Sequence, residues 1–564
     1  MRMARTITAS CITALLAGCA AQQDMGPVAS GRPTTEEVAD GSDVIVTTGS
    51  RQNEAVRNAP THTSPPPPPP APIVGKVAQE ARIAPPGYRV PPVMVAIDPG
   101  RERYDGKEVS PVHLVRAEPV STFSVDVDTG AYANTRRFLT EGRMPPRDAV
   151  RSEELINYFR YDYPLPDSRD TPFSITTDVA VTPWNPETRL MRIGLRGYDL
   201  RRSARPPANL VFLVDVSGSM RSQDKLPLVK TALSGLAGEL GKQDRVSIVV
   251  YAGAAGLVLE PTSDERKIRA ALDRLQAGGS TAGAAGLKLA YNIARDNFID
   301  GGVNRILIAT DGDFNVGVSD TRSLIEMIER ERENGITLTT LGFGTGNYNE
   351  AMMEQIADHG NGNYAYIDSA LEARKVLGEQ MSSTLFTIAK DVKIQVEFNP
   401  AQVSQYRLLG YENRALREED FDNDLVDAGD IGAGHQVTAI YEIVPAGAKG
   451  WIGPRRYDDP LPEAARGKAG ELAFVKLRYK LPNGKASRLI ERAVPAGLMH
   501  RSSRPTGDFA FATAVAAFGQ TLRGDEMMNG FTFDQITGLA RGQHDFWRQE
   551  FVRLVGVAES LKGG

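Results

Sequence analysis

Five apolar residues, Leu210-Val211-Phe212-Leu213-Val214, run directly into the polar segment Asp215-Val216-Ser217-Gly218-Ser219. A continuous apolar run of this length is typical of a strand that is buried on both faces. The next segment, Leu226–Leu240, places leucine and valine along one side of a helix. The sequence therefore predicts a strand, a short polar loop and a helix, which is the repeating unit of a parallel sheet.

The same alternation continues to about residue 380 and predicts an α/β domain with a mostly parallel sheet. In such sheets the binding site lies at the carboxyl ends of the strands, so the loops after Val214 and Ala309 are the places to examine. The further strands that we expect are Val246–Tyr251, Arg305–Ala309 and Thr337–Leu341, and the further helices are Ser263–Leu275, Gly283–Phe298, Leu324–Glu333 and Glu350–Ala357.

Three of these loops carry hydroxyls and carboxylates. Asp215, Ser217 and Ser219 follow the first strand, Thr281 opens a later helix, and Asp311 follows the strand that ends at Ala309. Oxygen donors of this kind suit Mg²⁺, or another divalent cation such as Mn²⁺ or Ca²⁺. Because histidine and cysteine are missing from these loops, zinc is disfavoured. Asp215 and Asp311 could also act as an acid–base pair, but their hydroxyl-rich neighbours suit a metal better.

These five residues, in this order, resemble the metal-ion-dependent adhesion site of the von Willebrand factor A (VWA) domain. The resemblance implies a Rossmann-like, doubly wound sheet. It also implies that the two serines and the threonine ligate the metal through their hydroxyls, and that the aspartates act directly or through water.

The regions around this domain resemble a family of bacterial VWA lipoproteins that has one flanking domain on each side of the VWA unit. The resemblance begins at about residue 118 and runs to the end of the chain, but it does not supply an activity. It is carried by the segments Phe123–Asn134, Ser152–Tyr161, Asn304–Val316 and Leu409–Arg414.

Both flanks show the period-two alternation of half-buried antiparallel strands. We therefore expect them to pair into one β-sandwich into which the VWA domain is inserted. The expected strands are Phe123–Asp128, Phe173–Val181, Leu190–Leu195, Val392–Phe398, Gln436–Ile443 and Ala473–Tyr479, and the expected helices are Thr129–Thr140, Ser152–Phe159, Phe509–Leu522 and His544–Leu561.

Composition excludes several classes of protein. Lys and Arg number 65 against 70 Asp and Glu, so no basic excess supports nucleic-acid binding. The only cysteines, Cys11 and Cys19, lie in the first twenty residues, which excludes disulfides and thiol chemistry from the rest of the chain.

The N-terminus predicts export and lipidation. An apolar run ends in Leu16-Ala17-Gly18-Cys19, which resembles the bacterial lipobox, where the cysteine carries the lipid. Acyl chains on Cys19 would hold the protein on a membrane, and Ala20, in place of the inner-membrane retention aspartate, favours the outer membrane by resemblance. The Pro-rich segment that follows, with six prolines at Pro65–Pro70, predicts a disordered tether.

The expected boundaries are therefore a lipoprotein signal peptide at 1–18, a tether at 19–117, an N-terminal flanking domain at 118–205, the VWA domain at 206–385 and a C-terminal flanking domain at 386–564. We expect a binding protein and no enzyme, since hydrolase elbows and phosphate loops are missing from the sequence. The partner would be an envelope protein that offers an Asp or Glu carboxylate to the metal. A metal-assisted hydrolase of the cell envelope and a purely structural metal site are the alternatives.

For three further motifs, a structural interpretation is favoured over a functional one. The acidic run Glu418–Asp430 lacks the glycine and glutamate of an EF-hand, which favours a solvated loop over a calcium site. The segment Tyr411-Glu412-Asn413-Arg414 favours a polar turn at a domain contact over ligand recognition. Tyr364 and Tyr366 are expected to fill the edge of a sheet.

Overall fold

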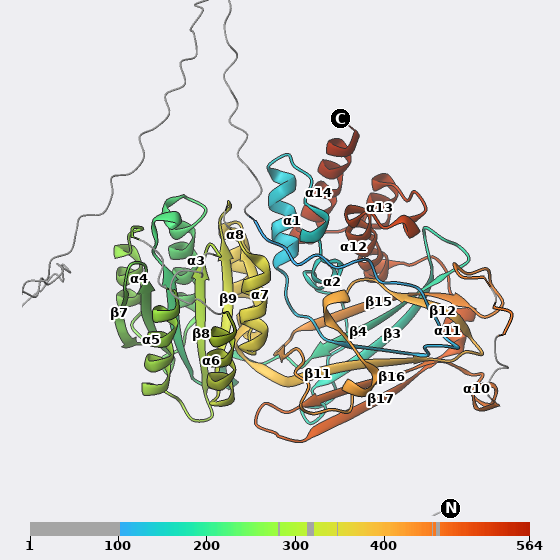
Figure 1. Cartoon of the computed structure of the whole chain (residues 1–564), viewed down its shortest axis with the longest axis horizontal. Helices are drawn as coiled ribbons and strands as arrows, with labels where there is room; N and C mark the ends of the chain where they lie inside the picture. The colour runs from blue at the N-terminus through green and yellow to red at the C-terminus, as the bar shows by residue number, and fades with distance from the viewer. Residues whose placement is uncertain are drawn as a thin grey trace, which may run out of the picture. The chain divides into compact units, whose positions relative to one another are not determined.

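The protein is described by a computed structural model that covers residues 102–279, 283–312, 321–346, 348–453, 455–457 and 463–563 (Figure 1). The predicted signal peptide, Cys19, the tether up to residue 101, and Thr281 lie outside the described residues. Residues 102–117, which the sequence assigned to the tether, belong to the fold. In this segment β1 (His113–Leu114) pairs with β12 (Val403–Leu408), and Val115 is buried. The folded part therefore begins by residue 102 and not at 118; a two-residue strand is too short to show a period.

A six-stranded sheet in the order β10-β9-β8-β5-β6-β7 forms the VWA region. All neighbours are parallel except β7, which returns antiparallel to β6 at the edge. The strands are β5 (Ala208–Asp215), β6 (Arg245–Tyr251), β7 (Ala255–Thr262), β8 (Val303–Thr310), β9 (Ile336–Phe343) and β10 (Tyr364–Ile367), and the helices are α3 (Leu226–Glu239), α4 (Glu265–Arg274), α5 (Gly283–Asp296), α6 (Thr321–Glu333), α7 (Glu350–His359) and α8 (Ala370–Arg374).

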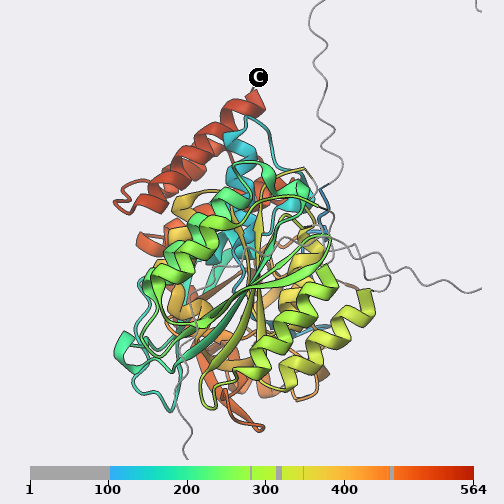
Figure 2. The ribbon, with the colours of Figure 1, turned by 90° about the vertical axis from the view of Figure 1, so that its left-hand side faces the viewer.

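Helices cover both faces of the VWA sheet (Figure 2), and alternate residues of its central strand β5 belong to different cores. Leu210 and Phe212 belong to a buried cluster with residues of α3 and α4, whereas Val211 and Leu213 belong to one with residues of α5 and α6. Burial on both faces explains why β5 reads as an unbroken apolar run. The predicted doubly wound, mostly parallel sheet is confirmed. The hairpin partner β7 was missed, because its half-buried sequence gives neither a continuous nor an alternating apolar signal.

Two antiparallel sheets pack face to face to form the predicted β-sandwich. One has the order β1-β12-β15-β4-β3 and the other β13-β2-β11-β16-β17, with β14 also paired to β11. Phe398 stacks on Tyr406 across the two sheets with ring centroids 4.5 Å apart, and the Tyr441 hydroxyl donates to Ser121 Oγ at 2.9 Å. The remaining strands are β2 (Val120–Ser124), β3 (Phe173–Val181), β4 (Arg189–Gly197), β11 (Thr387–Phe398), β13 (Ala415–Leu416), β14 (Ile431–Gly432), β15 (Gln436–Pro445), β16 (Glu471–Lys480) and β17 (Ser487–Pro495).

Both flanks contribute strands to each sheet. β4 from the N-terminal flank pairs with β15 from the C-terminal flank, and β2 pairs with β11. The VWA strands β5 to β10 lie between β4 and β11 in the chain. The prediction that the VWA domain is inserted into a sandwich shared by both flanks is therefore confirmed.

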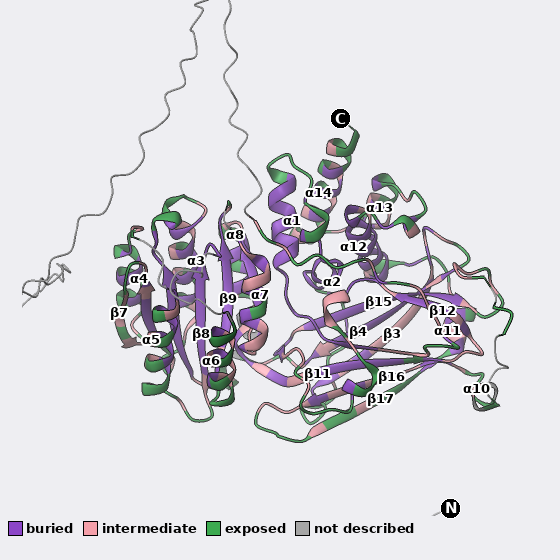
Figure 3. Cartoon of the chain, viewed as in Figure 1, coloured by how far each residue is buried: buried purple, intermediate pink, exposed green. Residues whose placement is uncertain are grey.

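Helices from both ends of the chain share a second core above the sheet that contains β15 (Figure 3). Phe159 and Phe511 meet edge to face there, with centroids 4.9 Å apart. These helices are α1 (Gly130–Thr140), α2 (Ser152–Asn157), α12 (Gly507–Arg523), α13 (Phe533–Leu539) and α14 (Phe546–Gly563). Among the described residues, no helix has the length and apolarity needed to cross a bilayer.

The predicted strand Phe123–Asp128 is only half right, because β2 ends at Ser124. Asp126 folds back and accepts a hydrogen bond from the Asp128 backbone nitrogen at 2.9 Å. Asp128 in turn accepts from the Tyr364 backbone nitrogen at 2.8 Å. Alternating carboxylates that imitate a strand pattern here form a turn that joins the flank to β10.

Candidate metal centre

The two predicted acidic loops lie side by side at the carboxyl end of the VWA sheet. β5 and β8 are parallel neighbours, with Val214 opposite Ala309, so that Asp215 and Asp311 each leave the sheet at the same edge. Both side chains are fully buried. The order of strands in the sheet thus brings together loops that are almost a hundred residues apart in sequence.

Asp215 is held by hydrogen bonds to both of its carboxylate oxygens. Oδ1 accepts from the Ser217 backbone nitrogen at 2.8 Å, and Oδ2 accepts from Thr310 Oγ1 at 3.0 Å. Burial raises the pKa of Asp215 to about 6, and the nearby Asp311 adds to the rise while these hydrogen bonds oppose it. Asp215 is therefore an oriented carboxylate whose position is fixed before any ligand arrives.

The predicted serine hydroxyls converge on one point. Ser217 Oγ lies 2.9 Å from Ser219 Oγ, with Ser217 buried and Ser219 exposed. The Gly218 backbone nitrogen donates to the Gly279 carbonyl at 3.0 Å, which joins this turn to the loop that leads toward Thr281. Four of the five predicted site residues are therefore gathered at one edge, while Thr281 lies outside the described residues.

Asp311 differs from Asp215 in its partners. Its Oδ2 lies 2.9 Å from Lys225 Nζ in a buried ion pair, with side-chain exposures of 0% and 8%. Its Oδ1 is buried and, among the described residues, has no hydrogen-bond partner. Lys225 was missed in the sequence. The only signal was a lysine at the start of the helix that follows the Asp215 loop.

Gly312, directly after Asp311, fixes the neighbouring turn. Its φ is +91°, and a Cβ there would lie 2.5 Å from the Asn349 backbone nitrogen. Both facts exclude a side chain at this position. The metal loop therefore packs directly on the start of α7.

The residues present fit a hard divalent cation. Carboxylate and hydroxyl oxygens meet at one edge of the sheet, and the unpartnered Asp311 Oδ1 is a donor that a cation would satisfy. Among the described residues, neither this edge nor any other place gathers three His, Cys, Asp or Glu side chains, so a cation here would rely on hydroxyl oxygens beside the two aspartates. The hydroxyl-rich edge is thus the metal site that the geometry supports.

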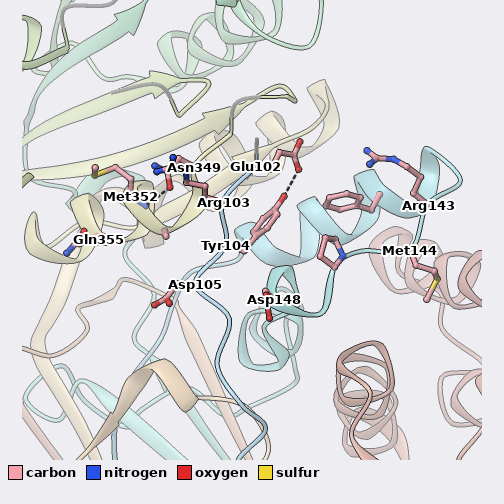
Figure 4. A pocket seen from close by; sticks show the side chains of 13 residues that line it. Glu102, Arg103, Tyr104, Asp105, Arg143, Met144, Asp148, Asn349, Met352 and Gln355 are labelled. Atoms are coloured by element: carbon pink, nitrogen blue, oxygen red, sulfur yellow. Dashed lines mark hydrogen bonds between the residues drawn. The ribbon is translucent and has the colours of Figure 1, made fainter. Parts of the chain in front are cut away.

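A pocket of about 840 Å³ lies beside this loop (Figure 4). Asn349, against which Gly312 packs, lines it together with Met352 of α7 and Asp148 of the N-terminal flank. The strap formed by residues 102–105 crosses it, where the Arg103 backbone nitrogen donates to the Tyr348 carbonyl at 2.9 Å and Tyr104 donates to Glu102 at 2.7 Å. Flank and VWA residues therefore share a cavity next to the candidate metal centre.

The three lesser motifs lie at contacts between the VWA region and its flanks. Arg414 pairs with Glu354 at 3.2 Å and with Asp358 at 2.5 Å, both on α7, which bears out the expected domain contact. Tyr364 and Tyr366 are buried on the edge strand β10, as expected. In the acidic run, which is largely exposed, five acids pair with basic side chains: Glu419 and Asp420 with Arg417, Asp422 and Asp424 with Arg478, and Asp427 with Arg332.

Three family models match the chain. Residues 209–380 match the model described as "von Willebrand factor type A domain", residues 383–561 match "Uncharacterized protein YfbK, C-terminal", and residues 98–192 match "von Willebrand factor".

Similar proteins include "Uncharacterized protein YfbK" of Escherichia coli (strain K12), which is 48% identical over 476 residues, covering 82% of this chain and 82% of that protein. "Uncharacterized protein sll0103" of Synechocystis is 31% identical over 244 residues, or 41% of this chain and 57% of that protein. A solved structure of a von Willebrand factor type A protein from Catenulispora acidiphila has a TM-score of 0.38 and 18% identity, covering 70% of this chain and 91% of its own.

Proposed function

Because this chain belongs to the YfbK family of VWA-domain proteins, we propose that it is a lipid-anchored envelope protein that captures a partner protein through a Mg²⁺-bridged carboxylate. The family matches confirm the VWA resemblance. A VWA domain itself implies a role in protein–protein interaction or adhesion, and such domains commonly bind a divalent metal. The identity of the metal, the carboxylate bridge and the anchor are the proposed parts.

The observation that carries the proposal is the composition of the metal edge. Among the described residues, Asp215 and Asp311 supply the carboxylates there, and Asp215 already accepts two hydrogen bonds. Ser217 and Ser219 supply neutral oxygens. In this arrangement Ser217, Ser219, Asp311 and Thr281 would hold the ion, and Asp215 would orient the turn.

When bound, the ion would supply a Lewis-acidic position that takes an outside carboxylate in place of water. The chain's own residues prepare that position. Asp215 holds the Ser217 backbone in place, and Gly312 lets the Asp311 loop pack on Asn349. The cavity beside Asn349 gives room for the partner residues that flank the acid.

The anchor would be a lipid on Cys19, with the Pro-rich segment as a spacer between the membrane and the folded region. Ala20 after the cysteine favours the outer membrane. The partner is then another envelope protein that exposes an Asp or Glu side chain.

Crosslinking in intact envelopes, with and without a chelator, tests this proposal. Wild-type protein should crosslink to a partner only without chelator, and Ser217→Ala/Ser219→Ala should give no chelator-sensitive product. Turnover of a cell-wall or phosphate-containing substrate that depends on Asp311 would instead favour a metal-assisted hydrolase. Loss of stability on chelation without any captured partner would favour a structural metal.

A further inference from the structure

We infer that Lys225 is a built-in counter-charge of the metal centre, which weakens its intrinsic affinity for a divalent cation and makes cation binding depend on an anionic ligand. This inference rests on the proposed function. It adds a specificity-determining residue, Lys225, that is not among the five site residues predicted from the sequence.

The position of Lys225 is fixed by packing. It precedes α3, and its backbone nitrogen donates to the Ser222 carbonyl at 3.1 Å. Its aliphatic chain lies against Gly344, where a Cβ would come 2.3 Å from Lys225 Cγ and 2.5 Å from Cε. Gly344 also has a φ of +72°, which is a second reason why a side chain is excluded there. The lack of a side chain at Gly344, in the loop after β9, thus leaves room for the lysine side chain, which reaches Asp311.

The ammonium group competes for the carboxylate that a cation needs. Lys225 Nζ lies 2.9 Å from Asp311 Oδ2, while Asp311 Oδ1 has no hydrogen-bond partner among the described residues. Among the described residues, the charged groups that meet here are Asp215, Asp311 and Lys225, and their charges sum to −1 (two negative charges and one positive). With a divalent cation the sum becomes +1, and one carboxylate from a partner returns it to zero. Charges this close in a buried site interact strongly, so the sum favours joint binding of cation and anion.

A role in stability alone explains the pair less well. A buried ion pair costs desolvation of both charges and is often no more stabilising than apolar side chains of similar size. An apolar residue would fill the space beside Gly344 equally well. A lysine that weakens binding of the cation alone, and so makes tight binding depend on an acidic partner, accounts for the charge at this position. Packing alone does not account for it.

Titration calorimetry of the full-length chain with Mg²⁺ alone tests this inference. Lys225→Met should bind Mg²⁺ at least about tenfold more tightly than the wild type, because a positive charge is removed from the site. Lys230→Met is the matched control, since Lys230 lies on α3 five residues after Lys225, is half-buried, and donates to the Asp273 carbonyl at 2.9 Å, away from the metal loops. It should bind Mg²⁺ as the wild type does. Added acetate should strengthen Mg²⁺ binding more in the wild type than in Lys225→Met.

Two further variants separate charge from packing. Lys225→Arg keeps the charge and should keep weak binding, whereas Lys225→Gln removes it and should bind tightly, with cooperative thermal unfolding of each variant checked first. If Met and Gln variants that fold cooperatively bind Mg²⁺ no more tightly than the wild type, the inference is wrong while the proposed function stands. If the wild type and all variants bind no Mg²⁺, both are wrong.

Discussion

At the residue scale, the two aspartates of the metal edge are not equivalent. Asp215 accepts two hydrogen bonds from neutral groups, whereas Asp311 Oδ2 accepts one from the ammonium of Lys225, with Nζ 2.9 Å away. Removing Asp311 therefore leaves a buried lysine without its carboxylate. Removing the serine hydroxyls breaks neutral contacts and no ion pair: the contact between Ser217 and Ser219, and the one between Ser217 and Asp215.

This difference predicts unequal effects on stability. Asp311→Ala should lower the free energy of unfolding by about 3 kcal/mol, because the buried ammonium of Lys225 loses its ion pair with Asp311. Ser217→Ala/Ser219→Ala should lower it by about 1 kcal/mol or less. Urea denaturation measures both values, and adding Lys225→Met to Asp311→Ala should restore part of the loss. Equal stability of Asp311→Ala and the wild type would contradict the structural account of the pair.

The sequence identifies Asp215, Ser217, Ser219 and Asp311 because each stands in a loop directly after a predicted buried strand. It does not identify Lys225, since the position of that side chain depends on Gly344, which lies more than a hundred residues further along the chain. Such a contact has no local pattern. It becomes visible only when β9 is placed in the sheet.

At the element scale, ion pairs join α7 of the VWA region to both flanks. Arg414 reaches Glu354 and Asp358 on α7, and Arg151 reaches Glu354 at 2.7 Å. Acids outnumber these arginines, and Glu350 Oε2 has no hydrogen-bond partner in the described residues. Burial raises the pKa of Glu153 to about 7 and that of Glu350 to about 8.

A pH dependence follows from the raised pKa values. An unfolded glutamate releases its proton near pH 4.5, whereas folded Glu350 keeps it until about pH 8. Between these values the folded state binds more protons, so the free energy of unfolding should fall as the pH rises. Relative to Glu350→Gln, which cannot ionise, the wild type should lose at least about 1 kcal/mol between pH 5.5 and 8.5.

Denaturation curves at several pH values check this prediction. Glu559→Gln, a substitution at an exposed position of α14, is the control and should follow the wild type at every pH. A stability difference between the wild type and Glu350→Gln that does not change with pH would show that Glu350 stays ionised throughout.

The strands that could be predicted from the sequence differ from those that could not in how far their residues are buried. Buried strands such as β5 and β8 and alternating strands such as β3 give clear patterns. β17 was missed because most of its residues are exposed or half-buried, and the short strands β1 and β13 are held by the neighbours they pair with. Edge strands of this kind are specified by pairing more than by their own residues.

At the scale of the whole molecule, the sandwich depends on both flanks. β15 has β4 on one side and β12 on the other, and β11 lies between β2 and β16. The alternation of apolar residues predicted a shared sandwich, but the order of its strands requires the structure. The contacts that residues 102–105 make with the start of α7 could not be predicted from the sequence for the same reason.

We predict that residues 383–563 do not fold alone, because β11 and β15 would each lack a neighbouring strand from the N-terminal flank. The longer chain 102–563 should unfold in one cooperative transition that includes the sandwich. Circular dichroism and thermal melting of both fragments give the comparison. Cooperative melting of 383–563 by itself would refute the shared sandwich.

We also predict that Cys19→Ala releases the protein from membranes, since acylation of Cys19 is the anchor that we propose. Fractionation of cells that express the wild type and the variant measures this effect. Wild-type protein should sediment with the outer membrane and the variant should not. A mature wild-type chain found wholly in the soluble fraction would refute the lipid anchor.

The most direct test of the account is a calorimetric titration of the full-length chain with Mg²⁺ in the presence of acetate, which supplies the anionic ligand, compared with the same titration of Ser217→Ala/Ser219→Ala. We predict saturable binding of one Mg²⁺ per chain in the wild type and a loss of at least about tenfold in affinity in the double variant, which should remain cooperatively folded. Binding of equal strength in both proteins, or no saturable binding in the wild type, would contradict the assignment of the metal centre to these loops.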